Sequence, residues 1–89
     1  MKVKVYVNWR SREVINEKEF EKLVEETFED YKGDQDYFSE WLADNYEVVQ
    51  VWEMNEEERI KTIKAFEEKC LSVARKEMLY DWEENELDV

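Results

Sequence analysis

The sequence predicts an α+β fold in which an N-terminal two-stranded β-hairpin precedes three packed helices, or four, with the last helix the longest. Three observations carry this prediction. Apolar and polar residues alternate over the first nine residues, as they do in a strand. Two Asn-x-x-Glu sequences, at residues 16–19 and 55–58, are typical of helix starts. After each of them, apolar residues recur at helical spacing.

The first strand is predicted from apolar side chains at every second position between Val3 and Trp9. This period is typical of a strand with one buried face, so we expect the valines and Trp9 to form that face. Residues 10–12 are expected to turn the chain. Residues 13–15 then return as a short antiparallel partner.

The first helix is predicted to run from Glu17 to about Tyr31. Asn16 occupies the N-cap position and Glu19 the reciprocal position of a capping box. At the other end stands Gly33, the only glycine of the chain. We expect it to end the helix in the left-handed conformation.

A second, shorter helix is predicted to begin after Asp34 or Asp36, either of which can cap it, and to close at Asn45. Residues 46–54 are ambiguous. Their valines favour a strand, while the spacing of their apolar residues also suits one helical turn. We slightly favour a short helix or an irregular turn and leave the strand open.

The longest helix is predicted to begin after Asn55 and to extend toward Trp82. Cys70 falls on its apolar stripe and is expected in the core. The acidic residues that follow, 83–89, are expected to fray, as chain ends often do.

Composition predicts a single small acidic domain over residues 1–89, because a chain of this length has room for one core. Cys70 is the only cysteine, which excludes an internal disulfide framework and fits a reducing compartment. The N-terminal residues lack the continuous apolar run of a signal peptide, and no segment is apolar over about 20 residues. We therefore expect a cytoplasmic protein.

The net charge of −12 is concentrated in the middle of the chain. Seventeen acidic residues lie between Glu13 and Glu58, against three lysines. A field of this sign repels nucleic acid and anionic membranes and attracts basic protein surfaces. We therefore expect a basic protein surface as partner, without direct binding of nucleic acid or membrane.

Catalytic and cofactor motifs are not found. The chain has no histidine, no Ser or Cys in a recognisable nucleophile setting and no glycine-rich phosphate loop. The acids around Gly33 do not follow the order of an EF-hand loop, and one cysteine without histidine cannot supply a zinc site. We expect a non-enzymatic protein that uses no cofactor or metal.

The candidate binding surface is a group of acids on the first helix and at the start of the second. Glutamates recur every four residues from Glu17 to Glu29, which places like charges about 6 Å apart along one helix edge. Three tyrosines, Tyr6, Tyr37 and Tyr46, fall off the apolar stripes and are predicted to be exposed contacts. The candidate set comprises Glu17, Glu21, Glu25, Glu26, Glu29, Asp30, Asp34, Asp36 and Tyr37.

In size, acidity and local clustering of carboxylates, the chain resembles as a class the small acidic inhibitors of phages and other mobile elements. Those proteins imitate nucleic acid and block a DNA-binding protein. The resemblance is one of composition and rests on no sequence motif. It implies an anti-defence inhibitor whose acids meet the Lys and Arg side chains of a target. The alternative is a small structural or regulatory interaction protein that binds a protein partner through apolar and tyrosine contacts and uses its acidity only for solubility. A third option is self-association through a helix face.

Overall fold

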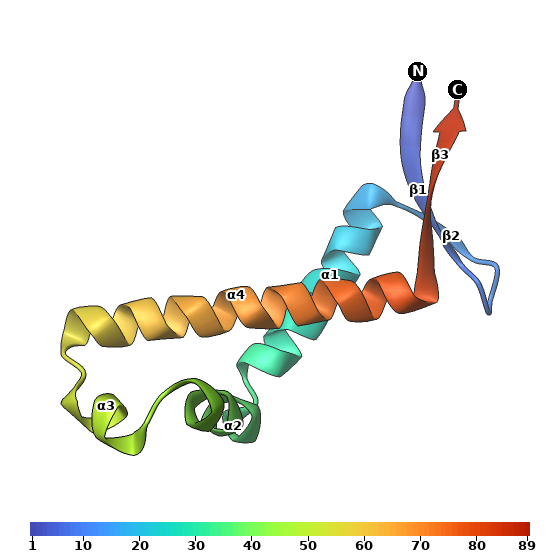
Figure 1. Ribbon diagram of the computed structural model, residues 1–89. Helices are drawn as coiled ribbons and strands as arrows, with labels where there is room; N and C mark the ends of the chain where they lie inside the picture. Colours follow the sequence, from blue (N-terminus) through green and yellow to red (C-terminus); the bar gives the residue numbers. More distant parts are fainter.

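The computed structural model describes residues 1–89 and confirms the α+β class (Figure 1). It contains a three-stranded antiparallel sheet and four helices, of which the last is the longest. The elements in chain order are β1 (Lys2–Asn8), β2 (Val14–Asn16), α1 (Glu17–Lys32), α2 (Gln35–Asn45), α3 (Val48–Glu53), α4 (Glu56–Asp81) and β3 (Trp82–Asp88).

Strand β3 was not predicted: the expectation that residues 83–89 fray is wrong. The strand order is β2-β1-β3, and β3 pairs with β1 from Lys2↔Asp88 to Asn8↔Trp82. Without it, one edge of β1 would expose a full row of unpaired backbone groups. The two strands are also complementary in charge, because Lys4 Nζ on β1 lies 3.0 Å from Glu84 Oε1 on β3.

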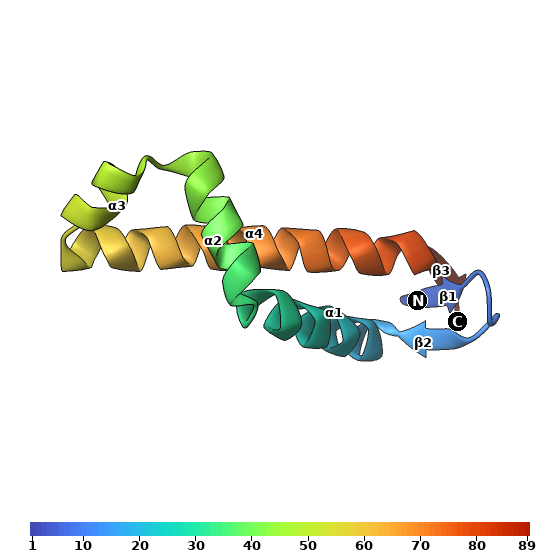
Figure 2. The ribbon, with the colours of Figure 1, turned by 90° about the horizontal axis from the view of Figure 1, so that it is seen from below.

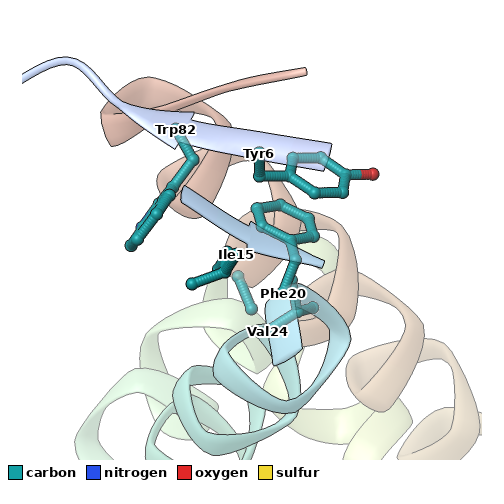
Figure 3. Close-up of a cluster of buried hydrophobic side chains, with 6 residues drawn as sticks. Tyr6, Ile15, Phe20, Val24 and Trp82 are labelled. Atoms are coloured by element: carbon teal, nitrogen blue, oxygen red, sulfur yellow. The ribbon is translucent and has the colours of Figure 1, made fainter. Parts of the chain in front are cut away.

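The helices cover the face of the sheet that carries Tyr6, which the sequence predicted to face solvent. Tyr6, Ile15 and Trp82 are buried on the helix side. The opposite face carries Val3, Val14 and Leu87, and we call it the open face. Of the residues predicted to be buried on it, Val5 is buried, whereas Val3 is 38% exposed and Trp9, just after β1, is 53% exposed. The ring of Tyr6 stacks on Phe20 of α1 with the two centroids 3.7 Å apart (Figure 3). The prediction of Tyr6 as an exposed contact is therefore wrong, and burial raises its pKa.

The junction between β2 and α1 explains this choice of face. Asn16 is both the last residue of β2 and the N-cap of α1, so no loop separates the two elements. The helix must therefore start beside the neighbouring residue, Ile15, and pack on that side of the sheet. The side-chain oxygen of Asn16 accepts a hydrogen bond from the Glu19 N–H at 2.8 Å, which confirms the predicted capping box.

The main core lies where α1 crosses the C-terminal half of α4. Phe20 and Val24 of α1 are fully buried, as are Cys70 and Ala74 of α4. Phe20, Val24 and Ala74 form one cluster with the buried sheet residues near the C-terminal end of α4, where β3 begins. The two chain termini lie together at the other end of the sheet (Figure 1). The prediction of Cys70 as a core residue is confirmed, and burial raises the pKa of its thiol.

Gly33 does not adopt the predicted left-handed conformation. Its φ of −81° and ψ of −7° are right-handed, and its N–H donates to the Glu29 carbonyl at 3.0 Å. The only residue of positive φ is Arg12, at 66°, in the turn between β1 and β2. Helix α1 therefore ends through backbone hydrogen bonds and the new N-cap at Asp34, which accepts from the Tyr37 N–H at 3.1 Å.

The remaining helices confirm the favoured reading of residues 46–54. Helix α3 forms there, and its first turn is closed by the Gln50 side chain, which accepts from the Glu47 N–H at 2.8 Å. Asn55 caps α4 as predicted, with its side chain accepting from the Glu58 N–H at 2.8 Å. None of the four helices combines the length and apolar composition that a membrane crossing requires.

The chain is elongated, with extents of 56 × 26 × 16 Å. Its radius of gyration is 17.3 Å, whereas about 12 Å is typical of a compact chain of this length. Helix α4 spans the molecule, with the sheet at one end and α2 and α3 at the other (Figure 2). The acidic α1 joins these two ends.

Candidate acidic protein-binding surface

Most of the predicted acids of α1 lie on its outer side. Phe20 and Val24 turn toward the sheet and α4, which leaves Glu25 and Glu29 exposed. Glu17 is exposed in the first turn on the sheet side, where its charge, after that of Glu84, helps to raise the pKa of Lys4. The remaining exposed acids of the candidate set are Glu26, Asp30, Asp34 and Asp36.

Most of these exposed acids have no basic partner within the chain. Glu29 is the exception on the outer side, because Lys32 Nζ lies 3.9 Å from its Oε1. Asp34 serves α2 as its N-cap. The acids that have neither a basic nitrogen within 4.0 Å nor a capping role are Glu17, Glu25, Glu26, Asp30 and Asp36, and we call them the free acidic set.

Glu21 is the one predicted acid that forms an ion pair with a residue of another element, Arg75 of α4. Both guanidinium nitrogens of Arg75 donate to its two carboxylate oxygens at 2.8 Å, in a bidentate arrangement. This hydrogen-bonded Arg75 lowers the pKa of the Glu21 carboxyl, and the same pair raises the pKa of Arg75. The pair links α1 to α4. It neutralises Glu21, the second glutamate of the predicted row from Glu17 to Glu29.

The Glu21 pair predicts a pH-dependent contribution to stability. Because the pKa of Glu21 is lowered in the folded state, its contribution is full above the unfolded value and is lost as the pH falls through the acidic range. Both side chains are more than 40% exposed, so we expect Glu21→Gln to cost below about 1 kcal/mol at pH 7.

Denaturant melts at pH 7 and pH 3 measure this effect. The gap in unfolding free energy between wild type and Glu21→Gln should narrow at pH 3. Glu25→Gln is the matched control on the same helix, because Glu25 has no ion pair to lose. A gap that stays constant between the two pH values would contradict a role for the ionised pair.

Tyr37 belongs to an aromatic cluster rather than to a free surface. It is half-buried, with its ring centroid 5.2 Å from that of Tyr31 and 5.8 Å from that of Phe66. Tyr46 is also half-buried and packs against Trp41 at 5.8 Å. Both tyrosines therefore offer only part of their rings to a partner.

Glu77 of α4 joins the acids at the end of α1, although the sequence did not suggest it. A hollow of about 270 Å³ between α1, α2 and α4 is lined by Asp30, Asp34 and Glu77. Tyr31 donates its hydroxyl to Glu77 Oε2 at 2.7 Å, and this hydrogen bond raises the pKa of Tyr31. Glu77 extends the acidic surface onto α4. No local sequence signal marks it, because it lies 46 residues away from Tyr31.

The arrangement suits electrostatic contact. No group of three or more His, Cys, Asp or Glu side chains is placed to hold a metal ion. Comparison with protein-family models, with curated proteins and with solved structures finds no match to this chain. The functional inference therefore depends on the charge, exposure and partners of these side chains.

Proposed function

We propose that this chain is a non-enzymatic protein-binding module that presents the free acidic set to a basic protein surface. The observation that carries the proposal is the contrast between two groups of acids. Glu84 and Glu86 of β3 and Glu21 of α1 form ion pairs with Lys4, Lys2 and Arg75. No residue of the free acidic set has a basic nitrogen within 4.0 Å. Exposed, unpaired carboxylates of one sign create a field that a cationic surface can neutralise.

The spacing of the free acids supports a likeness to nucleic acid. One helical turn places Glu26 and Asp30 of the free acidic set about 6 Å apart. Glu25 lies at the same spacing from Glu29, the acid that Lys32 approaches at 3.9 Å. One strand of duplex DNA carries a phosphate every ~3.4 Å, so each pair roughly matches every second phosphate. Like charges at this spacing disfavour the helix by a few tenths of a kcal/mol per pair. A cationic partner would remove that repulsion, which favours the complex.

The matching target is a protein with Lys and Arg side chains in a groove that otherwise holds nucleic acid. Complexes of this kind form quickly and weaken as salt rises, because screening acts on exposed charge pairs. An inhibitor that blocks a nucleic-acid-binding protein is the function that this surface supports best.

Charge reversal on the outer side of α1 tests the proposal. The variant Glu25→Lys/Glu26→Lys/Asp30→Lys changes three acids that neither cap a helix nor join an ion pair. The control variant Glu13→Lys/Glu53→Lys/Glu68→Lys makes the same change in net charge at exposed positions elsewhere. Each protein is immobilised, exposed to cell lysate and eluted with a salt gradient.

We expect wild type and the control variant to retain the same salt-released basic protein, and the α1 variant to lose it. Far-ultraviolet circular dichroism should show all three proteins folded. If the α1 variant holds that protein as tightly as the control does, the carboxylates serve solubility and the proposal fails.

A further inference from the structure

The end of the molecule farthest from the sheet exposes large apolar side chains. Five of them, on α3 and on the first turns of α4, have exposures between 47% and 81%. A groove of about 400 Å³ opens beside them between α2, α3 and α4, and Trp52 and Ile63 line it. We call this group the tip patch: Val48, Val49, Trp52, Ile60 and Ile63.

The tip patch exists because α1 covers only half of α4. Helix α1 ends at Lys32, and α2 turns away from its direction, as Figure 2 shows. On the N-terminal half of α4, Phe66 and Thr62 are buried, but Ile60 and Ile63 remain exposed. A continuous apolar stripe along α4 is thus covered at one end and open at the other.

The elongated chain as a whole exposes more surface than a compact monomer of its mass. The chain exposes 7163 Å², whereas a compact monomer of 11.0 kDa is expected to expose about 5,600 Å². The excess is about 1,500 Å². The five exposed side chains of the tip patch contribute to this excess. A stable dimer typically covers about 800 Å² on each partner.

Charges around Ile63 fit a second copy of the same chain. Arg59 and Glu67 lie four residues before and four residues after Ile63, and each lines a groove together with it. Neither has an oppositely charged partner within 4.0 Å in its own chain. In an antiparallel pair of α4 helices with the two-fold axis at Ile63, Arg59 of each copy stands opposite Glu67 of the other.

We propose that two copies of this chain associate through the tip patch, with the N-terminal halves of α4 antiparallel and Ile63 at the two-fold axis. The contact is isologous, because the same residues serve on both sides. Trp52, the most exposed of the apolar side chains on the patch, becomes the aromatic anchor of the interface. The free acidic set takes no part, so this inference does not rest on the proposed function.

Sedimentation velocity of the full chain over a range of concentrations tests the association. Wild type should shift from monomer to dimer as concentration rises, and Ile63→Lys should remain monomeric while folded. A control on the open face of the sheet, Val14→Lys/Leu87→Lys, should dimerise like wild type. A wild type that stays monomeric throughout, or a sheet variant that alone abolishes the dimer, overturns the proposal.

Charge exchange tests the pairing itself. Arg59→Glu or Glu67→Arg alone should raise the dimer Kd about tenfold or more, because each places like charges opposite one another on both sides of the axis. The double variant Arg59→Glu/Glu67→Arg should restore the wild-type Kd, and an equimolar mixture of the two single variants should form a heterodimer. A double variant no better than the single ones would contradict this geometry.

Discussion

Removal of residues 82–89 is expected to leave the chain without a stable fold at 25 °C. The truncation deletes β3 and so unpairs one complete edge of β1. It also removes Trp82 from the buried cluster with Tyr6 and Ile15. Loss of a buried Trp side chain alone typically costs about 3–5 kcal/mol, which is a large fraction of the roughly 4–13 kcal/mol expected of a chain this size.

Thermal melts of the truncated chain, of Trp82→Ala and of Leu87→Ala separate these contributions. Trp82→Ala should lower the midpoint strongly, whereas Leu87→Ala should change it little because Leu87 is half exposed on the open face. A truncated chain that unfolds cooperatively at the wild-type temperature would show that the C-terminal segment does not stabilise the sheet.

Phe66→Ala is expected to release α2 and α3 from α4. Phe66 is almost fully buried, and its ring lies 4.6 Å from that of Phe38 and 5.4 Å from that of Trp41. Removing it should cost about 3–5 kcal/mol of packing. Because this aromatic cluster is the main contact between α2 and α4, the loss should be local.

Hydrogen exchange measured residue by residue distinguishes local from global loss. Amides of α2 and α3 should exchange faster in Phe66→Ala, while those of β1 and of α1 retain most of their protection. Phe66→Leu, which keeps much of the volume, should cost less than about 1.5 kcal/mol. Equal loss of protection in the sheet and in α2 would mean that the two ends of the molecule unfold together.

The helix starts could be predicted from the sequence because their signals are local. A cap and its partner lie three residues apart, so Asn16 and Asn55 could be placed without knowledge of the fold. The cap of α2 was left open between Asp34 and Asp36, and the structure places it at Asp34. The short helix at residues 48–53 was only favoured, because its valines fit a strand as well.

The sheet was predicted less well because its third strand depends on a distant partner. Glu84, Glu86 and Asp88 of β3 alternate with the period of a strand, and Lys2 and Lys4 alternate in the same way. The acidic segment is ordered because it pairs with β1 from the other end of the chain, with ion pairs such as that between Lys4 and Glu84. The buried face was likewise decided by the direct junction at Asn16, which local hydrophobicity does not reveal.

The acidic surface was predicted in part. Exposure of the α1 acids follows from helical periodicity, because Phe20 and Val24 define the inner side. The loss of Glu21 to Arg75 could not be foreseen, since the two residues are 54 positions apart. Glu77 joins the surface for the same kind of reason, through its place on α4 beside Tyr31.

Competition with duplex DNA examines whether the acidic surface of α1 imitates nucleic acid. The basic protein retained by immobilised wild type at low salt is challenged with increasing duplex DNA at constant ionic strength. If the free acidic set occupies a nucleic-acid groove, DNA should displace that protein completely, and the Glu25→Lys/Glu26→Lys/Asp30→Lys variant should not retain it at all. A retained protein that excess DNA fails to displace, or that the variant binds equally well, would contradict nucleic-acid mimicry by this surface.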